Sequence, residues 1–188
     1  DGGEGNTYNI VWYLFFPNGS DTPSVRERVA ESQVGYNAYA TDMTVEPDGT
    51  VHIVHMLNTR KYGDPLPPDA PKEGTYHRRR DPITGEWSRT PLAPICIGGF
   101  WNTGKQLDVV TQDGGVLTRR SWDNSAKAWS GPTMFLDPKF ALTPPSFMDV
   151  ISASSGSILP SSIALVTDGL RPQEGDKPQE RVVWAILP

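Results

Sequence analysis

The chain has 188 residues and is acidic, with a formal net charge of −5 at pH 7 and an isoelectric point near 5.1. Nucleic acid is excluded as the expected partner, because phosphate binding needs a basic face. No apolar run approaches the ~20 residues of a membrane-spanning helix, so membrane insertion is not expected. Hydrophobic residues make up 37% of the chain, and 18 Gly and 18 Pro are dispersed among them, which predicts a turn-rich β protein.

The first segment with a strand pattern is an apolar and aromatic run at residues 8–16. A run with so few polar residues predicts a strand that is buried on both faces. The turn residues Pro17-Asn18-Gly19 follow, and residues 25–29 predict the partner strand. The triplet Asn18-Gly19-Ser20 also matches a glycosylation sequon, from which we expect an extracellular or secreted protein. A cytoplasmic location is the alternative that the sequence leaves open.

A second unit begins with a strand at residues 42–46 and turns at Pro47-Asp48-Gly49. The next strand covers residues 50–57, in which alternation predicts that His52 and His55 point to opposite faces. These two histidines therefore cannot chelate one ion together, and the single cysteine, Cys96, excludes both an internal disulfide and a cysteine-based metal site. We expect neither a metal ion nor a cofactor.

Two further units complete the chain. Residues 106–111 and 116–122 predict a hairpin around Asp113-Gly114-Gly115, and residues 162–167 and 181–187 predict another that begins its turn at Asp168-Gly169. The apolar strand cores of the four units start 41, 56 and 56 residues apart, at residues 10, 51, 107 and 163. A recurring unit of about 40–50 residues built from short strands is typical of a β-propeller blade.

The middle two units share an ending as well as a strand core. Gly74 to Arg79 runs on to Trp87-Ser88, and Gly115 to Arg120 runs on to Trp129-Ser130. Tryptophans at such a position are expected to pack between neighbouring sheets. The sequence therefore predicts an all-β propeller-type fold of about four units, with approximate bounds at 5–41, 42–94, 95–146 and 147–188. These units form either a single domain or a fragment of a larger propeller.

The candidate binding residues lie at the junction of units two and three. In the second strand of each unit, one face carries His77 and Arg79, and the corresponding face of the next unit carries Arg120 and Trp122. Sugars are bound by combining aromatic rings with charged hydrogen-bond donors, and Trp101 is a further candidate to line this cleft. The five residues predict a carbohydrate site between blades.

The third unit resembles one repeat of the fucose-specific-lectin-type propellers. The resemblance rests on residues 104–110, on 113–123 with their closing Trp122-Asp123, and on Trp129-Ser130-Gly131-Pro132. It implies a sugar-binding propeller without catalysis, with carbohydrate as its partner.

The second unit also resembles repeats of sialidase-like and ulvan-lyase-like propellers, through residues 46–54 and Tyr76-His77-Arg78-Arg79. Such lyases neutralise a uronate and abstract its C5 proton, which would make His77, Tyr76 and Arg79, or His55 and Tyr62, the candidates. A polysaccharide lyase or glycoside hydrolase is thus the alternative, a non-catalytic protein-interaction propeller is a third, and enzymatic activity stays open. Four units are fewer than either family normally has, which leaves a compact ring, a homo-oligomer or association with the rest of a longer chain.

Overall fold

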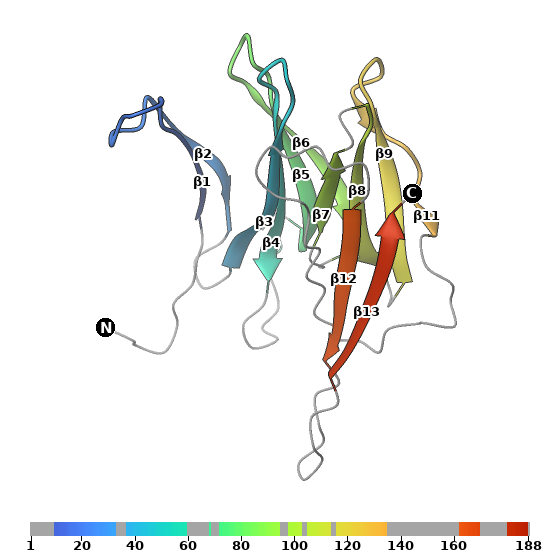
Figure 1. Ribbon diagram of the computed structural model, residues 1–188. Coiled ribbons are helices and arrows are strands. Elements are labelled where there is room, and N and C mark those ends of the chain that lie inside the picture. The colour runs from blue at the N-terminus through green and yellow to red at the C-terminus, as the bar shows by residue number, and fades with distance from the viewer. Residues whose placement is uncertain are drawn as a thin grey trace.

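The protein is all-β. The computed structural model describes residues 10–32, 37–59, 68, 72–94, 98–102, 105–113, 116–134, 162–169 and 180–187. Successive antiparallel sheets stand face to face in it, as Figure 1 shows for the sheets from β1 to β9. Within the described part of the chain, no helix has the length and apolar character needed to cross a membrane. Cys96 and Tyr62 lie outside the described residues.

Within the described residues, four sheets follow one another along the chain. Their strands are β1 (Ile10–Phe15) and β2 (Val25–Glu31); β3 (Asn37–Val45), β4 (Val51–Thr59), β5 (Gly74–Arg80) and β6 (Trp87–Ala93); β7 (Gly99–Asn102), β8 (Leu107–Asp113), β9 (Val116–Asp123), β10 (Ala128–Trp129) and β11 (Thr133–Met134); and β12 (Ser162–Gly169) and β13 (Glu180–Leu187). The middle sheets have the orders β3-β4-β5-β6 and β7-β8-β9-β10, with β11 also paired to β9.

This up-and-down order of consecutive antiparallel strands confirms the predicted fold class of blade-type sheets. The four apolar strand cores found in the sequence all lie in strands, one in each sheet. β3 starts at Asn37, five residues before the bound expected at residue 42. The division of the chain into four units with the stated bounds stays a prediction.

The sheets stack because β4 is apolar or aromatic on both faces. Val51, Ile53 and Leu57 pack against β1 and β2 in one core cluster, whereas Val54 packs against β7, β8 and β9 in a second cluster. The alternation predicted for this strand is confirmed, since His55 stacks on Tyr76 on the first side and His52 stacks on His77 on the second. A strand buried on both faces places the middle sheet between two neighbours.

Polar contacts tie the first sheet to the second. The Arg80 guanidinium donates twice to the Glu27 carboxylate, from Nε and Nη2, at 2.8 Å each. The indole Nε1 of Trp87 donates to the same carboxylate at 2.8 Å, and the Trp87 ring packs edge-on to Tyr13. Both Arg80 and Trp87 lie on the second sheet and Glu27 on the first, so the predicted packing of Trp87 between sheets is confirmed. The pKa of Glu27 lies below its usual value, mainly because of the hydrogen bond from Arg80.

The expectation that the strand near residues 8–16 is buried on both faces is wrong. Trp12, Leu14, Phe15 and Phe16 are 41–49% exposed. In the described structure this sheet has a neighbouring sheet on one side, where Val11 and Val29 join the core. On the other side, the guanidinium groups of Arg26 and Arg28 lie 4.8 and 5.6 Å from the Trp12 ring centroid. Cation–π contacts with these two arginines therefore cover part of the Trp12 ring in place of a sheet.

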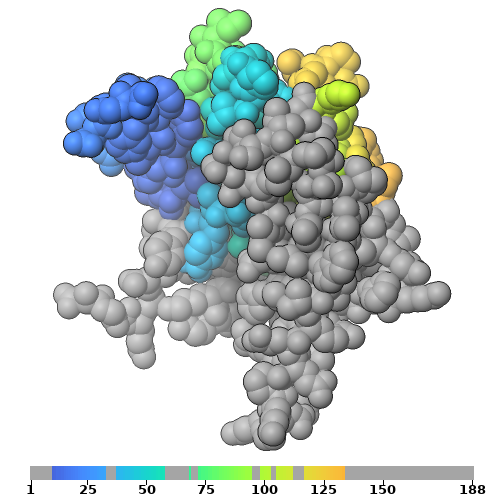
Figure 2. Space-filling model, in the orientation of Figure 1, coloured from blue at the N-terminus to red at the C-terminus, as the bar shows by residue number. Residues whose placement is uncertain are grey.

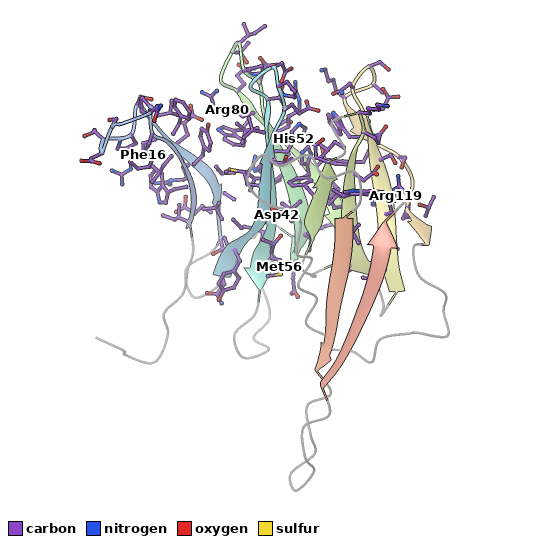
Figure 3. All side chains as sticks on the ribbon, viewed as in Figure 1. Phe16, Asp42, His52, Met56, Arg80 and Arg119 are labelled. Atoms are coloured by element: carbon purple, nitrogen blue, oxygen red, sulfur yellow. The ribbon has the colours of Figure 1, made fainter. Side chains whose placement is uncertain are left out.

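The second and third sheets are joined along β3 and β7. The Asp42 carboxylate accepts a hydrogen bond from the backbone N–H of Phe100 at 2.7 Å, and the Thr41 hydroxyl donates to the carbonyl of Gly98 at 2.8 Å. The register of β3 shifts between Ala40 and Asp42. A bulge of this kind re-aims the side chains that follow it. In Figure 3 Asp42 lies midway along β3, on the strand next to β7.

Gly98 marks a close approach between these two sheets. A Cβ atom placed on it would lie 2.9 Å from Cγ1 of Val54 and 3.2 Å from Cγ2 of Thr111. Both neighbours are fully buried and therefore cannot move into solvent.

We therefore predict that Gly98→Ala destabilises the protein by about 1–3 kcal/mol, the usual cost of overpacking a core. Gly131→Ala is the matched control, because a Cβ there meets nothing within 4 Å; its free energy of unfolding should stay within about 0.5 kcal/mol of the wild type. Urea unfolding followed by tryptophan fluorescence measures both. Equal stabilities of the two variants would contradict the close packing.

Candidate functional site

A polar cleft opens where the second and third sheets end together. Its volume is about 810 Å³, within the ~300–1,000 Å³ typical of ligand pockets. It is lined by the β3–β4 turn, the β7–β8 connection and the end of β9 with the turn after it: Glu46, Pro47, Asp48, Asn102, Lys105, Gln106, Leu107, Ser121, Trp122, Asp123, Asn124, Lys127 and Ser130. The β3–β4 and β9–β10 turns lie at the same upper end of the molecule in Figures 1 and 2.

Two of the three acids in the cleft are engaged in turns. Asp48 accepts a hydrogen bond from the backbone N–H of Thr50 at 2.8 Å, and this bond is the main reason that its pKa is lowered. Asp123 accepts from the hydroxyl of Ser125 and from the backbone N–H groups of Ser125 and Ala126, at 2.6, 2.8 and 3.0 Å. These bonds, led by the hydroxyl, lower the pKa of Asp123. The third acid, Glu46, lies beside His52 instead.

A buried aromatic cluster lies directly behind the cleft. His52 and His77 stack with ring centroids 5.1 Å apart, and Trp122 and Trp129 pack edge-on against His77 at 5.3 and 5.0 Å. Phe100 closes the cluster at 6.1 Å from both histidines. His52 and His77 come from β4 and β5, whereas the other three rings come from the third sheet. Figure 3 shows His52 between the two sheets, near their upper end.

A row of polar contacts runs through this cluster to the cleft. The indole Nε1 of Trp129 donates to Nδ1 of His77 at 3.0 Å, and Nε2 of His77 lies 2.9 Å from Nδ1 of His52. Nε2 of His52 in turn lies 3.4 Å from Oε2 of Glu46. This last distance is at the long limit for a hydrogen bond, and His52 Nε2 has no shorter bond among the described residues.

The indole fixes the direction of every proton in this row. An indole N–H can only donate, so Nδ1 of His77 must be unprotonated and its proton must sit on Nε2. His77 then donates to Nδ1 of His52, and the proton of His52 lies on Nε2, facing the Glu46 carboxylate. The row therefore reads Trp129 to His77 to His52 to Glu46, with all donors pointing toward the cleft.

Both histidines of the row are neutral. Burial is the first cause that lowers the pKa of His77, to about 2, with the neighbouring His52 and Arg79 adding to it. Burial also lowers the pKa of His52, opposed by the Glu46 carboxylate. An imidazolium would have no water to solvate it at this depth, so the neutral form is favoured. Within the described part of the chain, no group of three or more His, Cys, Asp or Glu is placed to hold a metal ion.

The structure brings together some of the residues predicted as a binding set. His77 and Trp122 are in contact, and Trp122 alone of the five lines the cleft. Arg120 lies at the same junction but is used within it, since Nη2 donates to the carbonyl of Leu92 at 2.9 Å and Nη1 to that of Ser130 at 3.3 Å. Trp129 packs between the sheets, as its place in the repeat predicted.

Arg79 lies at this junction, opposite His52 in the ladder between β4 and β5, but it does not line the cleft. Trp101 lies on another face. Nη1 of Arg79 is 3.5 Å from the Asp81 carboxylate on the β5–β6 turn. Trp101 is paired with Asp108 on the face of the third sheet that points away from the second sheet, where Arg119 lies 4.8 Å from its ring centroid and 2.7 Å from the Asp108 carboxylate. Figure 3 shows Arg119 on that distant side. As a ligand-binding set the five residues stay a prediction.

Sequence reasoning did not single out Glu46 from the other acids of the second unit, and it missed the lysines of the cleft. Glu46, Lys105 and Lys127 sit in or beside turns, which is where exposed charges occur in any β protein, so residue type alone did not distinguish them. The repeat was the one feature of the sequence that pointed to the contacts behind the cleft. Trp87 and Trp129 occupy equivalent places, and each donates its indole N–H to the preceding sheet, the first to Glu27 and the second to His77.

Comparison with known proteins adds a fold-level likeness. No family model and no curated protein matches the sequence. Among solved structures the chain is similar to a luciferin-regenerating enzyme, at 14% sequence identity and a TM-score of 0.46. The similarity covers 86% of this chain and 50% of that one, so this chain spans half the length of that protein. A likeness of this size carries no argument about function, and the resemblance to the fucose-specific-lectin-type repeats stays a prediction.

The buried histidines predict that stability falls in mild acid. His55, like the other two, is buried, and burial lowers its pKa to about 4. Below pH ~6.5 the unfolded chain binds protons that the folded chain does not, so the free energy of unfolding decreases as the pH falls from 6.5 toward 4. Each histidine contributes up to about 1.4 kcal/mol per pH unit in this window.

Urea unfolding between pH 7 and pH 5 measures this slope. His55→Phe keeps a ring packed on Tyr76 and removes one of the three titrating groups. The free energy of unfolding of this variant should therefore change less with pH, by up to about 1.4 kcal/mol per pH unit. A wild-type stability that does not change over this range would contradict the neutral state of the histidines.

Proposed function

We propose that the cleft binds carbohydrate without catalysing a reaction on it. The observation that supports this most is the lining itself, which combines carboxylates, ammonium groups, side-chain amides and hydroxyls around the edge of Trp122. A sugar hydroxyl both donates and accepts hydrogen bonds, so a sugar site needs both kinds of group within one pocket. The cleft offers acceptors at Glu46 and donors at Lys105 and Lys127.

Trp122 would act differently from the exposed aromatic plate expected from the sequence. Its side chain is buried among His52, His77 and Trp129, and its Nε1 donates to the Asn124 side chain at 2.9 Å. Gln106 donates to the backbone carbonyl of Trp122 at 2.9 Å. In this proposal Trp122 forms the apolar floor of the cleft and holds Asn124 in place, while the polar side chains around it recognise the sugar.

The position of His77 disfavours the lyase alternative. His77 is 1% exposed, and both of its ring nitrogens are engaged, with Trp129 and with His52. A base that abstracts the C5 proton of a uronate must reach that proton within hydrogen-bonding distance. Incubation with polygalacturonate, followed by the absorbance of an unsaturated product, tests the alternative directly; a signal abolished by His77→Gln would overturn the proposal of binding alone.

Calorimetric titration with two probes, methyl α-L-fucoside and trigalacturonate, tests the proposal. We expect measurable binding of at least one probe at millimolar concentration or below. Lys105→Ala should weaken binding of the anionic trigalacturonate about threefold or more, since an exposed charged contact contributes ~0.5–1 kcal/mol. Lys72→Ala is the matched control, because Lys72 is exposed and lies outside the cleft.

The proposal fails if the folded wild-type protein binds neither probe. Binding that is weakened equally by Lys72→Ala and Lys105→Ala would place the sugar outside the cleft and would also contradict it.

A further inference from the structure

The carboxylate of Glu46 lies at the edge of the cleft, whereas the carboxylate at the first junction, Glu27, is paired with Arg80. We propose that Glu46 is the ligand-binding carboxylate of the cleft, and that His52 and His77, fixed by Trp129, are its positioning residues. This inference rests on the proposed function and names the residue through which the cleft would hold a sugar hydroxyl.

The first support is the placement of Glu46, whose backbone is fixed in a turn and whose carboxylate lies beside His52. Its backbone N–H donates to the carbonyl of Thr50 at 2.9 Å, which closes the β3–β4 turn. Oε2 of its carboxylate lies 3.4 Å from Nε2 of His52, and its side chain is 16% exposed and lines the cleft. Asp48 and Asp123 each use one carboxylate oxygen, Oδ1, to cap a turn, whereas the Glu46 carboxylate lies next to the buried row of histidines.

The second support is the comparison of the two sheet junctions. At the first junction the tryptophan reaches a carboxylate directly, and Arg80 pairs with that same carboxylate, Glu27, through two hydrogen bonds. At the second junction two histidines separate the tryptophan from the carboxylate, so Glu46 lies at the mouth of the junction rather than inside it. Glu27 is bound within the first junction by Arg80 and Trp87, whereas Glu46 lines the cleft.

The row of histidines can orient the carboxylate but cannot carry a proton away from it. A proton relay would need a group at the far end that releases or takes up a proton, and an indole N–H does neither near neutral pH. The effect is therefore preorganisation. A glutamate side chain loses rotamer entropy when a ligand fixes it, and the approach to His52 restricts the side chain before a ligand binds.

Two matched pairs of variants test this inference by titration with the same two probes, methyl α-L-fucoside and trigalacturonate. Glu46→Gln removes the charge of the acceptor, and we expect binding to weaken about 10-fold or more, because a hydrogen bond to a charged group contributes ~1.5–3 kcal/mol. Glu86→Gln makes the same change at an exposed turn outside the cleft and should bind as the wild type does.

The second pair tests the positioning role. Trp129→Phe and Trp87→Phe each keep a ring between sheets and remove one indole donor, so both should lose stability. Only Trp129→Phe should also weaken probe binding, by several-fold, because only its donor fixes the histidines behind Glu46. In the wild type, the probe should shift the NMR signal of the His52 Nε2 proton and leave His55 unchanged.

The outcomes separate this inference from the proposed function. Binding to Glu46→Gln at wild-type strength overturns the inference and leaves carbohydrate binding standing. Equal weakening by the two Trp→Phe variants, or an unshifted His52 signal, overturns the positioning role. Binding of neither probe by the wild type overturns the proposed function and this inference together.

Discussion

The hydrogen bond from the indole of Trp129 to Nδ1 of His77 is the contact on which the second junction of this protein depends. It joins β10 of the third sheet to β5 of the second at 3.0 Å, in the middle of a cluster of five aromatic rings. A typical hydrogen bond contributes about 1 kcal/mol net, but a buried donor or acceptor without a partner costs ~1–3 kcal/mol. The bond therefore specifies how the two sheets meet more than it adds to stability, and it sets the proton positions of both histidines that follow.

A tryptophan indole donates to the preceding sheet at both junctions, but its acceptor differs between them. Each tryptophan stands at the outer strand of its sheet and donates to the sheet before it, Trp87 to Glu27 and Trp129 to His77. At the first junction the accepting carboxylate is neutralised by Arg80, and the contact ends there. At the second, the neutral pair His77 and His52 extends the row to Glu46, at the edge of the polar cleft. The tryptophan contact that recurs at both junctions therefore lies behind the candidate binding site at the second junction.

Much of the fold could be predicted from the sequence, because strand alternation and repeat spacing are local properties. The opposite orientations of His52 and His55 and the packing of Trp87 and Trp129 between sheets follow from them. The burial of β1 could not be predicted, since it depends on which faces of Trp12 and Leu14 a neighbouring sheet covers. The candidate cleft lies at the junction where the sequence placed its five candidate residues, but of these only Trp122 lines it, and the site stays a prediction. Whether an arginine faces a cleft or donates to a backbone carbonyl, as Arg120 does, depends on contacts 28 residues apart.

The central claim is that the indole of Trp129 fixes the tautomers of two buried histidines. Long-range ¹H–¹⁵N correlation spectra of histidine-labelled protein at neutral pH measure this directly, with His55→Phe used to assign the third ring. The account predicts that His77 and His52 both carry their proton on Nε2 and have an unprotonated Nδ1. A protonated Nδ1 on His77 would contradict it, because the indole could then not donate to that atom and the row to Glu46 would not exist.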